Sequence, residues 1–428
     1  MIDGRFFLPS TQNSLYGCNT YRLEIPHKEL KRYNCVFRYA AYLPSFPGVD
    51  TFRLMVEECK DYDMVMIQRC YLRPIVEIVR AVCDFLNIPL IFETDDDYTA
   101  IPVDNPAHWS MVSKEDIERY KSEPEKLEGI RQGGLSSYRE IISMMDGIIV
   151  STQELKNSLS MYNKNIFVLE NNIEEVPPYR SQDPEQAFVK TNAEGDQYVD
   201  LEHRMGVYSV PSHTIIDSSK ISWTPRINYS CTVTHWGQDF NTIAPYYEKV
   251  IEKNAKNCWF IWQGWERFLQ WHLNLAKEKN LPARCLWIPD AQYSLYMMNL
   301  RNTDIGLAPL APNPFNMSKS DIKAIEYAQW AAVPVLPNYI TYTRHWKHQE
   351  TCLIYQNGKE FMECLETLIN DHDFRMKLGA NARKYVAENR LERFHSEKRY
   401  KIYRAFIESK RKLRSYKLED LLVESSLS

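Results

Sequence analysis

Three charged residues in one short segment have the types and spacing of a nucleotide-binding site. The segment NMSKSDIKAIEYAQWAAVPVLP, residues 316–337, carries Lys319, Lys323 and Glu326 at positions i, i+4 and i+7. On a helix, this spacing places the three side chains on one side, with Glu326 about 10 Å beyond Lys319 at ~1.5 Å per residue. Lysines in a first helical turn are unfavourable unless an anion lies in front of them, because that end carries a partial positive charge. The pattern therefore predicts a diphosphate at the lysines and ribose hydroxyls at Glu326.

Neighbouring polar residues would complete this site. Asn316 and Ser318 can cap the start of a helix, and Ser320 lies beside the first lysine. In an alternative interpretation, Glu326 pairs with one of the lysines on an exposed helix face, which stabilises a helix by only about 0.2–0.5 kcal/mol. An apolar segment follows directly, so we expect a helix over 319–331 that packs against a sheet.

Three adjacent carboxylates, Asp95, Asp96 and Asp97, follow the apolar run PLIFET at residues 89–94. Oxygen ligands of this kind suit a divalent cation. A carboxylate beside a sugar could instead bind its hydroxyls or act as a general base. A helix cap accompanied by solvated acids is the third interpretation.

Two further loops have residues that could contact a ligand. In THWGQDF, His235 and Asp239 flank a glycine turn, and His235 could donate to a phosphate or position a substrate. A capping or packing role is the alternative for this histidine. Near the N-terminus, Gly17 precedes a predicted helix, and a glycine there lets the backbone approach a ligand closely, although an ordinary turn also contains glycine.

Strands and helices must alternate along the chain to position these loops. Apolar runs predict strands at 63–68, 89–94, 146–152 and 165–170, and in a second series at 226–233, 257–263, 284–289, 304–310, 332–337 and 351–356. Helical patterns separate them, notably at 73–87, 241–255 and 358–370. Alternation of this kind predicts parallel sheets covered on both faces, and two series predict two Rossmann-like domains. Ligands bind beyond the carboxyl ends of such strands, which is where the candidate loops lie.

Changes in composition along the sequence divide the chain into four parts. We expect a first α/β domain at 1–172, a polar, proline-punctuated linker or insertion at 173–225, and a second α/β domain at 226–389. A basic C-terminal helix and tail occupy 390–428, and the almost continuous helical pattern after residue 371 predicts a long helix that packs back across both domains.

Composition and missing motifs exclude several classes. The chain of 428 residues is 44% hydrophobic and 25% charged, as in ordinary globular proteins. It lacks a signal-like N-terminus, an apolar stretch of membrane-spanning length and any Cys-x-x-Cys pair, so we expect a cytoplasmic protein with reduced thiols. The phosphate-loop motif, Gly-x-Gly-x-x-Gly and Gly-x-Ser-x-Gly are also missing, which disfavours the familiar NTPases, dehydrogenases and serine hydrolases.

Positive charge is concentrated near the C-terminus. Residues 390–417 contain eleven Lys/Arg and three Asp/Glu, an excess of +8 that leaves −12 for the rest of a chain with net charge −4. A solvated helix face is one interpretation. An anionic membrane surface, which would make the protein peripheral to a membrane, or a nucleic-acid backbone are the others.

Several segments together resemble GT-B glycosyltransferases of the glycosyl-transferases-group-1 type. The matching segments cover most of the chain apart from 173–225 and the last residues, and they are MIQRCYLRPI, IPLIFETDDDY, DGIIVSTQEL, LENNI, RINYSCTVTHWGQDF, DIGLAPLAPNPFNMSKSDIKAIEYAQWAAVPVLPN and FRMKLGANARKYVAEN. The resemblance implies two Rossmann-like domains facing a cleft, a nucleoside-diphosphate sugar as donor, and no bound metal.

The resemblance also implies roles for individual residues. Glu326 would bind the donor ribose, whereas Lys319 and Ser320 at the helix start would hold the diphosphate and stabilise the departing charge. Asp95 and Asp96 would face the donor sugar and acceptor, and Gly17 would lie under the donor. The candidate catalytic residues are therefore Asp95, Asp96, His235 and Lys319, and the candidate donor-binding residues are Gly17, Asn316, Lys319, Ser320, Lys323 and Glu326.

Two positions depart from the family pattern. Ser318 stands where relatives have the first glutamate of a Glu-x7-Glu pair, and Cys231 stands where they have a glycine. The leading hypothesis is transfer of a sugar to a hydroxyl of a glycan, a lipid-linked glycan or another polymer. The alternatives are transfer to a modified base in DNA and a non-catalytic, sugar-nucleotide-binding or interaction protein with a degenerate GT-B fold.

Overall fold

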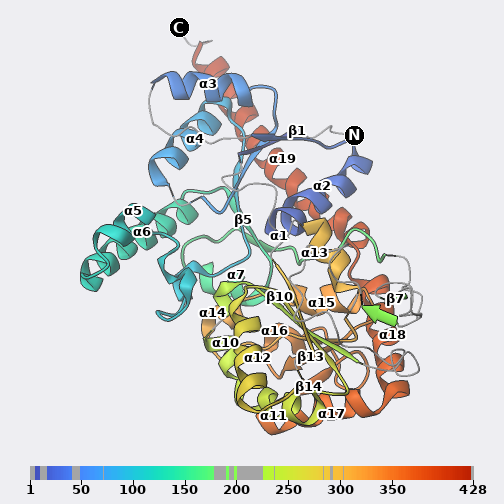
Figure 1. The fold of residues 1–428 in the computed structure, drawn as a ribbon. Helices are drawn as coiled ribbons and strands as arrows, with labels where there is room; N and C mark the ends of the chain where they lie inside the picture. Colours follow the sequence, from blue (N-terminus) through green and yellow to red (C-terminus); the bar gives the residue numbers. More distant parts are fainter. Residues whose placement is uncertain are drawn as a thin grey trace.

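The chain forms two α/β units, one above the other in Figure 1, each built around a parallel six-stranded sheet. The computed structural model describes residues 5–9, 17–40, 49–70, 72–177, 189–191, 197–199, 225–235, 237–282, 284–289, 293–301 and 303–425. Most of the predicted linker 173–225 therefore lies outside the described residues. Within it, β7 (Val189–Thr191) and β8 (Gln197–Val199) pair antiparallel.

The N-terminal unit contains the sheet β2-β1-β3-β4-β5-β6. Its strands are β1 (Arg5–Pro9), β2 (Val36–Ala40), β3 (Met64–Gln68), β4 (Leu90–Thr94), β5 (Gly147–Val150) and β6 (Ile166–Val168). Every residue of β3, β4 and β5 is buried, because helices cover both faces of a parallel sheet, and these strands were predicted. Strands β1 and β2 were not predicted. The edge strand β2 exposes Val36 and Tyr39 and thus lacks a continuous buried run.

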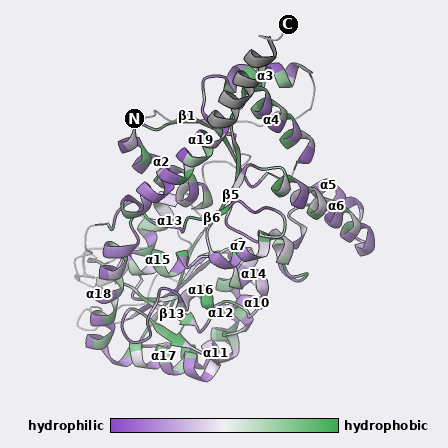
Figure 2. Ribbon diagram, turned by 180° about the vertical axis from the view of Figure 1, so that it is seen from behind, coloured by the Kyte–Doolittle hydropathy of each residue, from purple (hydrophilic) through white to green (hydrophobic). Residues whose placement is uncertain are grey.

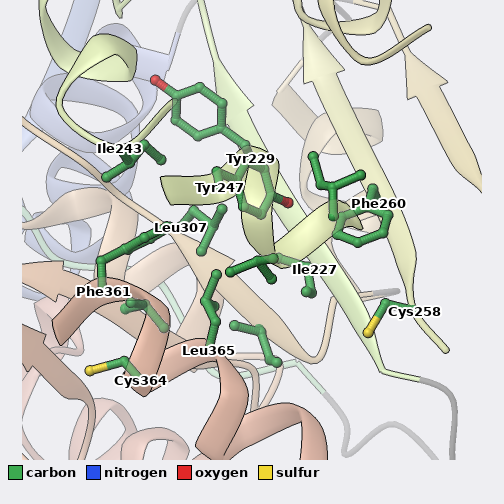
Figure 3. Close-up of a cluster of buried hydrophobic side chains, with 14 of the residues drawn as sticks. Ile227, Tyr229, Ile243, Tyr247, Cys258, Phe260, Leu307, Phe361, Cys364 and Leu365 are labelled. Atoms are coloured by element: carbon green, nitrogen blue, oxygen red, sulfur yellow. The ribbon is translucent and has the colours of Figure 1, made fainter. Parts of the chain in front are cut away.

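The C-terminal unit contains the sheet β11-β10-β9-β12-β13-β14, and all six strands were predicted. They are β9 (Arg226–Cys231), β10 (Trp259–Gly264), β11 (Cys285–Ile288), β12 (Ile305–Leu307), β13 (Val333–Pro337) and β14 (Leu353–Tyr355). Figure 3 shows part of the core on one face of this sheet, where Tyr229, Tyr247 and Phe361 gather. The Tyr247 and Phe361 rings meet edge to face at 6.1 Å between centroids, which joins α11 to α17.

Helices and single turns fill the connections. In the N-terminal unit they are α1 (Gly17–Asn19), the π-helical turn η1 (Thr20–Glu24), α2 (Ile25–Leu30), η2 (Lys31–Tyr33), α3 (Val49–Cys59), α4 (Arg73–Leu86), η3 (Tyr98–Ala100), η4 (Pro106–Trp109), α5 (Lys114–Arg119), α6 (Pro124–Ser143) and α7 (Gln153–Leu159). In the C-terminal unit they are η5 (Val233–His235), α10 (Gln238–Asn241), α11 (Ala244–Asn254), α12 (Arg267–Glu278), α13 (Tyr293–Leu300), α14 (Pro314–Met317), α15 (Ile322–Ala328), α16 (Ile340–Thr343) and α17 (Gly358–Asn370). Figure 2 shows mostly hydrophilic residues on outer helices such as α6.

The helix expected over 319–331 is shorter than predicted. Asn313 caps an earlier helix, α14, in which Asn316 lies, and α15 begins only at Ile322. The prediction that Asn316 and Ser318 cap the donor helix is therefore wrong, and Lys319 precedes α15 instead of lying in its first turn. A separate helix begins upstream because Asn313 and Pro314 are strong helix-start signals. This helix, α14, ends at Met317, before α15 begins at Ile322.

The C-terminal segment packs against both units, as predicted, but as two helices. Helix α18 (His372–Asn389) contacts α15 and β13, and α19 (Glu392–Ser425) contacts α2 of the other unit. Between them the backbone of Leu391 pairs with that of Ile173 in a parallel bridge. Figure 1 shows α19 running along the N-terminal unit.

Cysteine pairing and helix hydrophobicity bear on two expectations for the whole chain. All ten cysteines lie in the described part of the chain, and none forms a disulfide bond. Among the described residues, no helix has the length and apolar character that a bilayer span requires.

Candidate functional site

The loops singled out in the sequence lie at the switch points of the two sheets. In the C-terminal sheet, β9 and β12 are neighbours although they are not consecutive, and ligands of such sheets bind beyond the carboxyl ends at this point. The His235 loop follows β9, and the segment Asn313–Ser320 follows β12. In the N-terminal sheet, β1 and β3 form the corresponding pair, and Gly17 begins the first helix after β1.

Side chains from the two units meet at these loops. The Thr152 hydroxyl donates to the Ser318 carbonyl at 2.7 Å, and the Asn171 amide donates to the Ser320 hydroxyl at 2.8 Å. Phe315, from the segment after β12, is buried within the hydrophobic core of the N-terminal unit. The carboxyl ends of the two sheets therefore face each other, with the predicted donor segment between them.

Glu326 is buried and has three hydrogen-bond partners. Its Oε1 accepts from the Tyr21 hydroxyl at 2.8 Å, and its Oε2 accepts from the Tyr296 hydroxyl at 2.7 Å. The Lys323 ammonium donates to Oε2 at 3.0 Å and also to the Tyr296 hydroxyl at 2.6 Å. The alternative ion pair considered for Glu326 is thus formed with Lys323, but in a buried environment instead of on an exposed face.

Lys319 lies apart from this group. Its ammonium is 4.7 Å from the centre of the Phe315 ring, and it forms no ion pair with any described residue. Its positive charge acts on His235 and Asp239, which places the lysine beside the loop after β9. Lys319 is therefore a cation at the switch point whose charge the described side chains do not pair directly.

His235 and Asp239 form a hydrogen-bonded pair. The distance between His235 Nδ1 and Asp239 Oδ2 is 2.7 Å, and Asp239 Oδ1 accepts from the Asn316 amide and the Ala311 backbone N–H, each at 2.7 Å. Burial and the charge of Lys319 hold the pKa of His235 below its usual value, although Asp239 opposes them. Asn316 thus orients Asp239, which in turn orients the imidazole.

The turn that carries this pair requires a glycine. Gly237 has φ of 84° and ψ of −95°, in a region that other residues rarely adopt. This conformation lets α10 begin at Gln238, so that Asp239 in its first turn can reach the imidazole.

The acidic triplet divides into two parts. Arg69 donates through Nε to Asp95 at 2.8 Å and through Nη2 to Asp96 at 2.8 Å. Although burial opposes it, the charge of Arg69 keeps the pKa of Asp95 below its usual value. Asp97 caps η3 and accepts from the Thr99 backbone, so its role is structural. Within the described residues, no group of His, Cys, Asp or Glu side chains is arranged to hold a metal ion.

Sequence reasoning missed three residues of this region: Arg69, Tyr21 and Tyr296. Arg69 directly follows β3 and has φ of 48°, a conformation uncommon outside glycine and asparagine. Arg69 follows one strand, and the three aspartates follow the next strand along the chain. Because neighbouring parallel strands end side by side, this arrangement could have signalled an ion pair. No local pattern marked the two tyrosines, because they act on a residue far away in the sequence.

The basic C-terminal segment is largely neutralised within the protein. Five of the seven Lys and Arg side chains described between 390 and 410 form ion pairs, namely Arg390 with Asp321, Arg399 with Glu392, Lys401 with Glu397, Arg404 with Glu408 and Lys410 with Asp146. The side chains from 411 onward lie outside the description. The described part of the segment is therefore a largely ion-paired helix, in which Arg390 and Arg399 are buried, and not an open cationic surface.

Comparison with solved structures identifies the fold. No protein-family model and no curated protein sequence match the chain. Anabaena HepE in complex with UDP matches with a TM-score of 0.59 at 10% identity, covering 94% of this chain and 100% of HepE. A glycosyltransferase from Rickettsia africae and the sucrose-phosphate synthase of Thermosynechococcus elongatus each match with a TM-score of 0.59 at 12% identity, covering 95% of this chain and at least 99% of theirs. The chain therefore has the GT-B fold that the sequence predicted.

Proposed function

We propose that this protein is a glycosyltransferase that moves a sugar from a nucleoside-diphosphate sugar to a hydroxyl group. The observation that carries the proposal is the grouping at one switch point of Lys319, the His235–Asp239 pair and Glu326, opposite the acidic loop of the other unit. A cation and an oriented imidazole suit a diphosphate, and a carboxylate suits a ribose.

On the donor side, Lys319 and His235 would bind the diphosphate. Nδ1 of His235 donates to Asp239, so Nε2 can donate to a phosphate oxygen only when the imidazole is protonated, a state that a bound diphosphate would favour. As the bond to the sugar breaks, negative charge grows on the leaving diphosphate, and a lysine held beside it stabilises that charge. HepE is described in complexes with UDP and UDP-glucose, so a UDP-sugar is the first donor to test.

On the acceptor side, Asp95 and Asp96 would bind sugar hydroxyls. Asp96 is the more accessible of the two, with 26% of its side chain exposed against 12% for Asp95. Since Arg69 holds the pKa of Asp95 down, Asp95 is a weak base and suits hydroxyl binding. The described part of the C-terminal segment is largely ion-paired and gives DNA no particular support, so glycan and lipid-linked glycan acceptors are the first to test.

Nucleotide binding and turnover test the proposal. Calorimetry with the diphosphates UDP, GDP, ADP and dTDP and the monophosphate CMP, each with and without Mg²⁺, should show one diphosphate that binds selectively. Glu326→Ala and Lys319→Met should abolish that binding, whereas Glu366→Gln, a change at a surface pair with Lys253 in the same unit, should not. Release of the nucleotide from its sugar conjugate that requires a saccharide acceptor, together with detection of the glycosylated acceptor, would then establish transfer, because release alone also follows from hydrolysis.

Two results would contradict the proposal. If none of the diphosphates binds, the protein is not a glycosyltransferase of this kind. If one binds but its sugar conjugates are never consumed with any acceptor, the non-catalytic alternative holds instead.

A further inference from the structure

We propose that Tyr21 regulates the donor site by occupying Glu326 when no nucleotide is bound, so that donor binding requires the two units to separate locally. This inference rests on the proposed function, in which Glu326 binds the donor ribose. It assigns a role to the contact between the Tyr21 hydroxyl and the Glu326 carboxylate, which is 2.8 Å long and joins the two units.

Tyr21 is inserted among residues of the C-terminal unit. It is buried in a core that otherwise consists mostly of C-terminal residues, its ring meets that of Tyr293 edge to face at 5.2 Å, and its hydroxyl lies 3.7 Å from the Met297 sulfur. The side chain therefore fills space beside Glu326 as well as bonding to it. A ribose that approaches Glu326 would have to replace the ring and its hydroxyl together.

The Glu326 carboxylate has little capacity left while Tyr21 is present. A carboxylate offers about four acceptor positions, and Tyr21, Tyr296 and Lys323 use three of them at a residue that is only 4% exposed. The two hydroxyls of a ribose need two positions. Tyr296 and Lys323 belong to the same unit as Glu326 and move with it. Tyr21 is the partner that departs when the units separate.

Tyr21 is firmly attached to the N-terminal unit. It lies in the π-helical turn η1, and such turns are rare and often found at functional sites. The next residue, Arg22, is fully buried, forms an ion pair with Glu93 and donates to the Asn171 side chain at 2.9 Å. Because Arg22 fixes η1 to the N-terminal sheet, a displacement of that unit carries Tyr21 away from Glu326.

The energetic consequence has a definite sign. The nucleotide competes with the Tyr21 hydroxyl for the same carboxylate, so removing that hydroxyl should make the nucleotide bind more tightly. A hydrogen bond to a charged group corresponds to roughly a tenfold change or more in an equilibrium constant. Tyr21→Phe deletes the hydroxyl and keeps the ring, so the core around it is preserved.

The test is titration of UDP into the full-length protein and four variants by calorimetry. We expect Tyr21→Phe to lower the Kd for UDP roughly tenfold, and Glu326→Gln to weaken binding in both the wild-type and Tyr21→Phe backgrounds. Tyr296→Phe is the matched control, because it removes a hydroxyl on the same carboxylate from within the C-terminal unit. It should leave the affinity equal or weaker.

The outcomes separate this inference from the proposed function. Equal or weaker UDP binding by Tyr21→Phe, together with loss in Glu326→Gln, would overturn the role of Tyr21 and leave the donor site standing. Binding by Tyr21→Phe but not by the wild type would support the inference most strongly. Absence of binding in every protein, with the other diphosphates included, would overturn both.

Discussion

Arg390 and Asp321 form a buried, two-pronged ion pair at the point where the chain passes between the units. Nη2 of Arg390 lies 2.9 Å from Oδ1 of Asp321, Nη1 contacts Oδ2, and each side chain is 3% exposed. Arg390 also donates to the Asn171 carbonyl of the N-terminal unit at 2.8 Å. Asp321 directly precedes α15, so the pair connects the crossing segment with the helix that carries Lys323 and Glu326.

Replacing Arg390 with methionine should lower the free energy of unfolding by about 3–5 kcal/mol, because Asp321 would remain buried without a counter-charge. Urea denaturation followed by tryptophan fluorescence measures this loss. The more accessible pair of Lys253, 66% exposed, and Glu366, 20% exposed, provides the control, and Lys253→Met should cost about 1 kcal/mol, less than the loss at Arg390. A double variant with Asp321→Asn should recover part of the loss. Equal effects at the buried and exposed pairs would contradict this account.

Gly379 of α18 marks a close contact with the turn before β13. A Cβ at this position would lie 2.1 Å from the Ala331 carbonyl oxygen, so Gly379→Ala should force the helix outward and cost about 1–3 kcal/mol of stability. Gly133 in α6 has nothing within 4 Å of such a Cβ, and Gly133→Ala should instead stabilise by about 0.5–1 kcal/mol. Thermal unfolding of the two variants compares them directly. The prediction fails if both shift Tm in the same direction.

The His235–Asp239 pair predicts a pH dependence of stability. The folded protein holds the pKa of His235 below its ordinary value through burial and Lys319, so the unfolded chain binds more protons as pH falls through about 6.5. The free energy of unfolding that the neutral, buried His235 contributes is therefore present above pH 6.5 and decreases as the pH falls below it. Unfolding measured from pH 8 to pH 5 should show a steeper decline for the wild type than for His235→Asn.

Adding UDP provides a second test of this pH dependence of stability. A diphosphate bound beside Lys319 would raise the pKa of His235, so UDP should reduce the decline in the wild type and leave that of His235→Asn almost unchanged. Parallel pH profiles of the two proteins without a ligand would show that His235 is not held in its neutral form.

Arg69 should prove essential for tolerating the adjacent aspartates. Arg69→Gln leaves Asp95 buried and unpaired, and its pKa should then rise above that in the unfolded chain. We expect a loss of roughly 3 kcal/mol at pH 7 that becomes smaller at pH 4, where the carboxyl group can be protonated. Denaturant unfolding at the two pH values tests this. A loss that is the same at pH 4 as at pH 7 would mean that Arg69 stabilises the fold by packing alone.

Strands were predicted correctly from the sequence where all their residues are buried, and the less buried edge strand β2 was not predicted. Strands such as β3 and β13 are buried at every residue, and a continuous apolar run records that directly. The edge strand β2, in which Val36 and Tyr39 are exposed and no residue from 36 to 39 is fully buried, was missed. The start of the donor helix was placed too early because Asn313 and Pro314 begin a separate helix, and nothing in the local pattern ranked the two starts.

In the candidate site too, some features were predicted from the sequence and others were found only in the structure. Lys319, His235 and Asp95 were chosen because charged and polar residues after strand ends are available for chemistry, and Glu326 because of its helical spacing from the lysines; Glu326 lies within α15. Their roles in binding and catalysis stay predictions. Their partners were found only in the structure. Arg69 binds the aspartates from the neighbouring strand, and Asn316 orients Asp239 instead of capping a helix.

The alternation of strands and helices, the two parallel sheets and the loops on which charged residues gather could be predicted from the residues alone. They follow from propensity and periodicity, which depend on residues a few positions apart. The partner of each charged side chain depends on the fold. Glu326 accepts from Tyr21, 305 residues away along the chain, because the order of strands brings their loops together. A carboxylate attracts any donor within reach, and the fold alone decides which donors come within reach.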